Sequence, residues 1–194
     1  MIRLIMGGTR SGKSSFAERI ANSIGGSDVI YLATAEIRDE EMKKRVKRHR
    51  QDRPASWQTI EEPYQVSKVL ENVPRKSVVL LDCITVLISN LLLRGEAVDK
   101  DQNDFKIEGK EIDILSELES VIKAAQENKL ELIMVTNEVG LGLVPTYKLG
   151  REYRDISGKA NHYLAQKADE VYLLSAGLAI EIKEMGLKNL AKFS

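Results

Sequence analysis

The stretch that decides the fold is Gly7-Gly8-Thr9-Arg10-Ser11-Gly12-Lys13-Ser14, which matches the pattern G-x-x-x-x-G-K-[S/T]. An apolar run over 2–6 precedes it and a helical pattern over 13–23 follows it, as a phosphate-binding loop (P-loop) requires. Glycines let backbone N–H groups surround phosphate oxygens, and the next helix points its positive end toward them. We therefore predict that this whole stretch binds a nucleotide, with Lys13 on the outer phosphates and Ser14 as a ligand of Mg²⁺.

Outward from this loop, short apolar runs alternate with amphipathic stretches. The runs that predict further strands cover residues 29–33, 78–82, 130–136, 171–175 and 178–182, and the last two form a hairpin. The helical patterns cover residues 39–50, 64–71, 107–127 and 149–167, and the polar stretch 95–105 predicts a loop. In the third helix, the apolar positions at steps of three and four are Ile112, Leu115, Leu118 and Ile122. Continuous apolar strands separated by helices predict the α/β class, with a mostly parallel central sheet flanked by helices.

Length and composition narrow the class further. The chain has 194 residues, 43% of them hydrophobic and 30% charged, which is typical of one globular domain. Lysine plus arginine and aspartate plus glutamate both total 29, so the zero net charge argues against a general nucleic-acid binder. We expect residues 1–194 to form a single P-loop nucleotide-binding domain, with 183–194 as a short helix or a loose tail.

The cysteine count and the length of the apolar stretches limit the kinds of site and the cellular location. A single cysteine, Cys83, excludes an internal disulfide and a cysteine zinc cluster. No stretch approaches the roughly 20 apolar residues of a membrane helix, and the run over 2–6 is too short for a signal peptide. We therefore expect a cytoplasmic protein without a membrane span.

An acid, Asp82, closes the apolar run that begins at Val78. P-loop proteins place a carboxylate near magnesium at the end of such a buried strand. The alternative is that Asp82 caps the helix that follows. Both interpretations stay open at this stage.

A strongly basic segment surrounds His49. Residues 38–53 contain eight lysines and arginines and four acids. His49 shares one helical face with Met42 and Val46, so it could be a packed core side chain. Alternatively, the positive surroundings keep its imidazole neutral and therefore nucleophilic, and the arginines can bind a triphosphate. This second interpretation predicts a histidine that attacks phosphorus.

Six stretches occur together in one order: Gly7–Ser14, Tyr31-Leu-Ala-Thr-Ala-Glu36, Arg48-His-Arg-Gln-Asp-Arg-Pro-Ala-Ser-Trp57, Leu81-Asp-Cys-Ile-Thr85, Val135-Thr-Asn-Glu-Val-Gly140 and Arg151-Glu-Tyr-Arg-Asp-Ile-Ser-Gly-Lys-Ala-Asn161. Together they resemble the bifunctional adenosylcobinamide kinase/adenosylcobinamide-phosphate guanylyltransferase family of cobalamin biosynthesis. The resemblance extends from about the first residue to Lys183. It implies a RecA-like P-loop fold and a homo-oligomer, typically a trimer.

The resemblance also implies two reactions. A nucleoside triphosphate, ATP or GTP, phosphorylates the aminopropanol hydroxyl of adenosylcobinamide. GTP then donates GMP to that phosphate through a histidine–GMP intermediate, giving adenosylcobinamide-GDP and pyrophosphate. The family's histidine falls on His49, and Asp82 falls where the family has a carboxylate near the nucleotide. The nucleotide contacts implied beyond the loop are Thr34, Ala35, Glu36, Arg50, Gln51, Asp52, Arg53, Glu61 and Asp82.

Two other functions remain possible from the residues alone. One is a small-molecule P-loop kinase without guanylyl transfer, and the other is a nucleotide-switched assembly module. Asn137 and Glu138 end a predicted strand at the edge where parallel sheets bind ligands, so they are candidates for substrate contact. The glycine-containing segment 139–145 is either a substrate loop or a plain connection.

Overall fold

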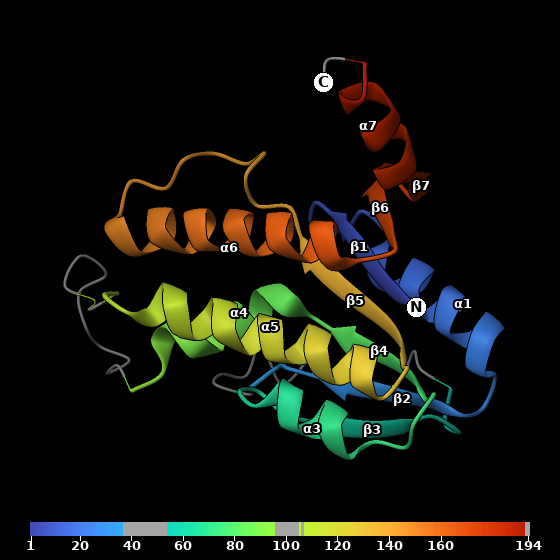
Figure 1. The fold of residues 1–194 in the computed structure, drawn as a ribbon. Helices are drawn as coiled ribbons and strands as arrows, with labels where there is room; N and C mark the ends of the chain where they lie inside the picture. The colour runs from blue at the N-terminus through green and yellow to red at the C-terminus, as the bar shows by residue number, and fades with distance from the viewer. Residues whose placement is uncertain (37–53, 96–104, 106, 193–194) are drawn as a thin grey trace.

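The computed structural model describes residues 1–36, 54–95, 105 and 107–192, whose strands form one sheet covered by helices (Figure 1). The strands are β1 (Ile2–Gly7), β2 (Val29–Ala33), β3 (Gln58–Glu61), β4 (Val78–Asp82), β5 (Glu131–Asn137), β6 (Glu170–Ser175) and β7 (Leu178–Glu181). The helices are α1 (Lys13–Gly25), α3 (Val66–Asn72), α4 (Ile84–Leu93), α5 (Lys110–Glu127), α6 (Lys148–Lys167) and α7 (Lys183–Leu190).

The strand order is β3-β2-β4-β5-β1-β6-β7. Every neighbouring pair is parallel except β6 and β7, which form an antiparallel hairpin. The strand before the phosphate-binding loop, β1, is thus separated from β4 by β5. The predicted α/β fold, with a mostly parallel central sheet flanked by helices and a C-terminal hairpin, is confirmed.

Both faces of the sheet are covered, which explains the continuous apolar strands. Successive strand residues alternate between two cores: Leu4 and Leu132 belong to one, and Ile5 and Ile133 to the other. The helices α3, α4, α5 and α6 bury one face, whereas α1 covers the other through Ala17 and neighbouring residues (Figure 1).

The buried face of α5 agrees only in part with the expected one. Leu118 and Ile122 are buried as expected, but Ile112 is 71% exposed, and the buried side also contains Ile114, Val121, Ala124 and Ala125. Ile112 was wrongly assigned because it lies only two residues before Ile114, and two residues rotate a helix by about 200°. The apolar step from Ile112 to Leu115 was therefore a coincidence of spacing.

Two elements were not predicted. The helix α4 is mostly apolar, and two of its three polar residues, Thr85 and Asn90, are buried, so it shows no amphipathic periodicity. The strand β3 is short, largely exposed and polar, and it lies at the edge of the sheet. Of the predicted elements, 39–50 and most of 95–105 lie outside the described residues. The C-terminal tail contains α7, and no helix in the described part of the chain is long and apolar enough to cross a membrane.

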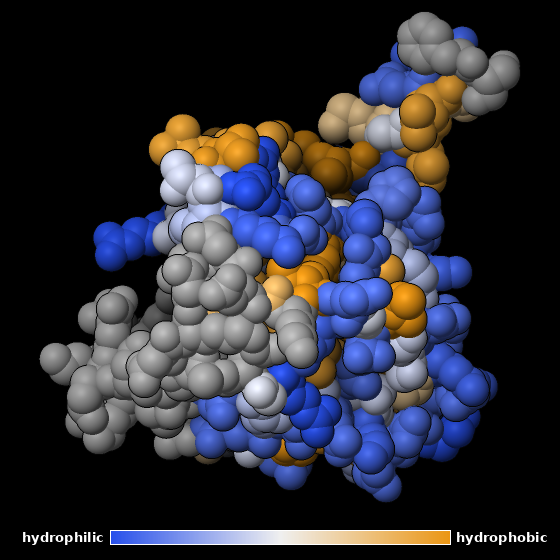
Figure 2. Space-filling view, turned by 90° about the vertical axis from the view of Figure 1, so that its left-hand side faces the viewer, coloured by the Kyte–Doolittle hydropathy of each residue, from blue (hydrophilic) through white to orange (hydrophobic). Residues whose placement is uncertain are grey.

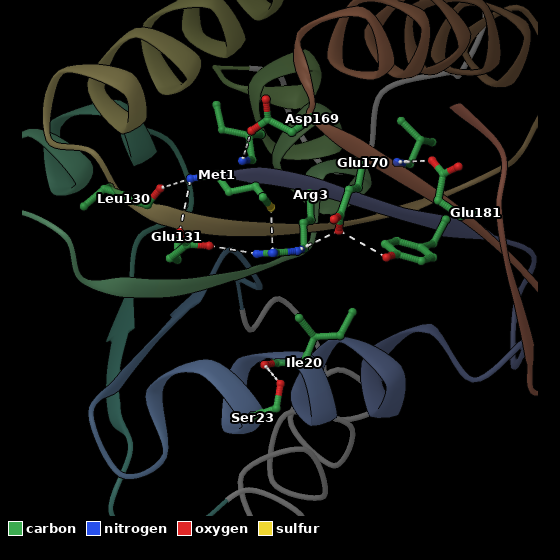
Figure 3. Close-up of polar contacts among 12 residues, drawn as sticks. Met1, Arg3, Ile20, Ser23, Leu130, Glu131, Asp169, Glu170 and Glu181 are labelled. Carbon is green, nitrogen blue, oxygen red and sulfur yellow. Dashed lines mark hydrogen bonds and ion pairs between the residues drawn. The ribbon is translucent and has the colours of Figure 1, made fainter. Parts of the chain in front are cut away.

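A charged cluster joins three strands at the end of the sheet opposite the phosphate-binding loop (Figure 3). The Arg3 guanidinium in β1 donates to Glu131 of β5 and to Glu170 of β6, both at 2.8 Å. The carboxylate of Asp169 accepts the backbone N–H of Ile2 at 2.6 Å. Since Arg3 is only 14% exposed, these contacts help to fix the register of β1 between its two neighbours.

The face of the molecule shown in Figure 2 is mostly hydrophilic outside the grey atoms, with hydrophobic side chains gathered in a few places. The exposed apolar residues include Leu141, Leu143 and Val144, in the segment between β5 and α6. This segment was predicted to be either a substrate loop or a plain connection. In either case, its apolar side chains face solvent.

The corrected face of α5 predicts a contrast between two substitutions. Leu118→Ala removes a fully buried side chain and should lower the free energy of unfolding by about 2–5 kcal/mol. Ile112→Ala should change it by less than about 0.5 kcal/mol, because that side chain is in solvent. Urea unfolding followed by circular dichroism measures both values, and equal losses would contradict the assigned face.

Candidate active site

The phosphate-binding loop lies between β1 and α1, as the motif predicts. Gly7 ends β1, and Gly12 takes a left-handed conformation with φ of 94° just before α1. A Cβ on Gly7 would lie 2.4 Å from the carbonyl oxygen of Leu174, and one on Gly12 would lie 3.3 Å from the Cα of Gly177. The glycines of the motif are therefore needed both for backbone conformation and for close packing against the β6–β7 hairpin.

Neighbouring strands hold the loop through backbone hydrogen bonds. The Glu138 N–H, just after β5, donates to the Gly7 carbonyl at 3.0 Å. On the other side, the Gly177 N–H in the hairpin turn donates to the Ser11 carbonyl at 3.0 Å. The loop is thus fixed from both sides of β1 before any ligand binds.

The polar side chains of the loop suit phosphate. Lys13 is 8% exposed, and its Nζ donates to the carbonyl oxygen of Gly8 at 2.6 Å, so the ammonium lies across the loop. The hydroxyl of Ser11 is buried without a protein partner in the described part of the chain. Since buried hydroxyls are normally hydrogen-bonded, a phosphate oxygen could complete its bonding.

At the carboxyl end of β4, Asp82 is half-buried and its Oδ2 accepts the phenol O–H of Tyr31 at 2.6 Å. Tyr31 is 1% exposed, so this contact holds the carboxylate in one orientation. The N-cap residue of α4 is Cys83, and no side-chain hydrogen bond caps this helix, so Asp82 does not serve as its cap. No sequence pattern indicated the tyrosine contact, because the two residues are 51 positions apart.

Thr34 ties the end of β2 to the end of β4. Its hydroxyl donates to the Cys83 carbonyl at 2.8 Å and accepts the Cys83 N–H at 3.0 Å. The buried amide of Asn90, a residue that sequence reasoning missed, donates to the carbonyl oxygens of Thr34 and Pro63. The hydroxyl of Thr34 is therefore engaged in hydrogen bonds to the protein backbone.

The remaining described nucleotide candidates lie at the same edge of the sheet. Ala35 and Glu36 follow β2 and are half-buried, and the Glu36 Oε2 accepts the Tyr64 O–H at 2.7 Å. Glu61 ends the outermost strand β3, which is separated from β1 by β2, β4 and β5. The candidates His49, Arg50, Gln51, Asp52 and Arg53 lie outside the described residues.

A hydrogen-bonded network fixes the end of β5. The Asn137 amide donates to Thr85 Oγ1 at 2.8 Å, and the Asn161 amide donates to the Asn137 carbonyl at 3.1 Å. The Tyr153 O–H donates to the Thr85 carbonyl at 3.1 Å, and burial raises the pKa of Tyr153 to about 12, so this donor keeps its proton. The side chain of Asn137 thus supports β5 and its neighbours.

The residues present fit a magnesium–nucleotide complex. No cluster of three or more histidine, cysteine or acidic side chains occurs within the ranges that the structure describes. Mg²⁺ bound with a nucleotide needs only one or two protein oxygens, because phosphates and waters complete its shell. The hydroxyl of Ser14 and the carboxylate of Asp82 are oxygen donors of this kind.

This edge, with a phosphate-binding loop beside an acid at the end of β4, defines a P-loop nucleotide-binding protein. A family model described as "Cobinamide kinase / cobinamide phosphate guanyltransferase" matches residues 3–182, and the chain belongs to this family. It is 40% identical to the bifunctional adenosylcobalamin biosynthesis protein CobU of Escherichia coli over 94% of this chain and all of that protein. It is 38% identical to CobU of Salmonella typhimurium, over 94% of this chain and all of that protein.

A third relative is the bifunctional adenosylcobalamin biosynthesis protein CobP of Pseudomonas aeruginosa, 38% identical over 93% of this chain and 96% of that protein. Among solved structures, the chain is similar to the flagellar accessory protein FlaH from Methanocaldococcus jannaschii. That similarity has 15% identity and a TM-score of 0.49, and it covers 94% of this chain and 77% of that one.

Family membership confirms the predicted enzyme class. The chain is a bifunctional transferase with cobinamide kinase and cobinamide phosphate guanylyltransferase activities. The two alternatives, a kinase without guanylyl transfer and an assembly module, are not favoured.

The packing of the loop predicts a difference between two adjacent glycines. Gly7→Ala forces a methyl group against the Leu174 carbonyl and should destabilise the protein by about 1–3 kcal/mol. Gly8→Ala should leave the free energy of unfolding within about 0.5 kcal/mol, because a Cβ there meets nothing within 4 Å. Thermal and urea unfolding of the two variants would show this difference, and equal stabilities would exclude the close packing at Gly7.

Proposed function

We propose that the chain phosphorylates the hydroxyl of adenosylcobinamide with ATP or GTP and then transfers GMP from GTP to adenosylcobinamide phosphate through a covalent intermediate on His49. The observation that carries the proposal is the phosphate-binding loop between β1 and α1, with Asp82 on the same sheet edge. Membership of the cobinamide kinase / cobinamide phosphate guanyltransferase family supports the choice of substrate.

The loop binds the phosphates of the nucleotide. Its backbone N–H groups and the N-terminus of α1 supply positive partial charge, and Lys13 adds a full charge on the outer phosphates. The buried Ser11 hydroxyl donates to a phosphate oxygen. Because these donors are held in place by β5 and the hairpin, they stabilise charge that develops on the leaving group without rearrangement.

Ser14 and Asp82 would hold Mg²⁺, which when bound offsets the negative charge of the phosphates. Tyr31 supports this role, because its O–H fixes the orientation of the Asp82 carboxylate. On the resemblance to the family, Thr34, Ala35, Glu36, Glu61 and Arg50–Arg53 contact the rest of the nucleotide.

In the guanylyl transfer, the neutral imidazole of His49 attacks the α-phosphorus of GTP. A nitrogen–phosphorus bond forms, and the bond to pyrophosphate breaks. A phosphate oxygen of adenosylcobinamide phosphate then attacks the same phosphorus and releases the histidine. Two successive displacements make this half of the activity ping-pong.

We further infer a cytoplasmic homo-oligomer, a trimer by resemblance to the family. The net charge of zero supports small-molecule partners over a nucleic acid.

Incubation with GTP labelled in its α-phosphate tests the intermediate. The wild type should acquire acid-labile label, and His49→Ala should lose it, because only an imidazole at that position can form the phosphoramidate bond. His162→Ala is the matched control, since that histidine is exposed on α6 beside Gln166, and it should keep the label. Label that survives His49→Ala would exclude His49 as the nucleophile.

Magnesium titration tests the role of Asp82. Asp82→Asn removes a charged oxygen ligand and should raise the Mg²⁺ concentration for half-maximal kinase activity at least about tenfold, by analogy with the loss of groups that orient or hold a metal. Asp28→Asn, at an exposed position before β2, should leave that concentration unchanged. Identical titration curves for the two variants would remove Asp82 from the metal site.

A further inference from the structure

The kinase step needs a general base that accepts the proton of the substrate hydroxyl. A hydroxyl that attacks the γ-phosphorus must lose its proton, and kinases place a carboxylate within hydrogen-bond reach of that hydroxyl. The group must lie at the carboxyl edge of the sheet, beside the loop that holds the phosphates. It must also have a free oxygen when the substrate arrives.

Several acids at this edge are already engaged. Asp82 accepts the Tyr31 O–H and is proposed to bind magnesium, and Glu36 accepts the Tyr64 O–H. Glu62 uses its Oε1 to accept two backbone N–H groups after β3, far along the sheet from β1. None of these carboxylates is both beside β1 and available.

Glu138 meets both conditions. It follows β5 directly, and β5 lies between β4, which ends at Asp82, and β1, which leads into the phosphate-binding loop. Its own backbone N–H donates to Gly7, the first residue of the loop, at 3.0 Å. The residue is therefore anchored where the loop begins, between the loop and the proposed magnesium ligand.

The side chain of Glu138 is held by one oxygen only. Oε1 accepts the Gly140 N–H at 2.7 Å, whereas Oε2 has no protein partner within the part of the chain that the structure describes. The Gly140 carbonyl in turn accepts from the guanidinium of Arg154 in α6 at 2.6 Å, which fixes the turn. The half-buried carboxylate is thus oriented in advance and keeps one oxygen available.

We propose that Glu138 is the general base of the kinase step, an inference that rests on the proposed cobinamide kinase activity. The substrate hydroxyl oxygen attacks the γ-phosphorus, and a new oxygen–phosphorus bond forms. The bond between that phosphorus and the β–γ bridging oxygen breaks, so the nucleoside diphosphate leaves with the electron pair. The hydroxyl proton passes to Oε2 of Glu138.

This role concerns only one of the two reactions. In the guanylyl transfer the acceptor is a phosphate oxygen that is already anionic, so no proton has to be removed from it. Loss of the Glu138 carboxylate should therefore separate the two activities, whereas loss of a merely structural contact would affect both.

Glu138→Gln tests the proposal, because the amide oxygen can still accept the Gly140 N–H while the base is lost. Phosphorylation of adenosylcobinamide by γ-labelled ATP or GTP should fall about 10²–10⁴-fold in kcat, with KM for the nucleotide within about threefold. Transfer of label from α-labelled GTP to adenosylcobinamide phosphate should stay within about threefold of wild type. Glu119→Gln, at an exposed position on α5, is the control and should not change either rate.

Gly140→Ala offers a second test that keeps the carboxylate but moves it. A Cβ at this position would lie 2.7 Å from Glu138 Oε1 and meets no backbone within 4 Å, so the side chain must shift while the fold is preserved. Kinase activity should fall selectively here as well.

The outcomes separate the two claims. Full kinase activity in Glu138→Gln, or an equal loss of both reactions, would overturn the role of Glu138 while leaving the proposed function intact. A wild-type protein that phosphorylates no adenosylcobinamide would overturn the proposed function and this inference together.

Discussion

Phosphate binding by backbone N–H groups imposes one constraint on the whole molecule: the loop from Gly7 to Ser14 must be both open and rigid. Openness requires residues without Cβ atoms at Gly7 and Gly12, where the hairpin packs closely. Rigidity comes from outside the loop, through the end of β5 and the turn between β6 and β7. Because these supports lie at the ends of strands, the loop keeps its shape only when the sheet has formed.

The elements that carry a strong periodic or apolar signal were the ones predictable from sequence. Strands buried on both faces appear as continuous apolar runs, which is why β1, β2, β4, β5 and β6 were found. The helix α4 was missed because it is mostly apolar and has no polar side to reveal its period. The edge strand β3 was missed for the opposite reason, since it is too polar and too short. Ile112 shows that a single residue of a correctly predicted helix can still be assigned to the wrong face.

At the site, local motifs could be predicted from the sequence, whereas hydrogen-bond partners that are distant in sequence could not. The loop, Lys13 and Asp82 follow from spacing and position in the chain. The contacts that orient them, such as Tyr31 to Asp82 and Gly177 to Ser11, join residues far apart in sequence. In the sequence, Asn90 and Tyr31 lie within apolar segments, and nothing there indicates that their polar groups form hydrogen bonds at the site. Their importance depends on which strand ends meet, and strand order is a property of the folded sheet.

The position of β1 has a consequence for how the chain acquires its structure during synthesis. Its two neighbours, β5 and β6, begin at Glu131 and Glu170, so β1 has no sheet partner until the segment containing β5 has left the ribosome. The hairpin turn that supports the loop emerges later still. At a synthesis rate of about 5–20 residues per second, this leaves the apolar strand β1 unpaired for roughly 6–26 s. Nascent chains therefore gain a complete phosphate-binding loop only after the turn at Gly177 has left the ribosome.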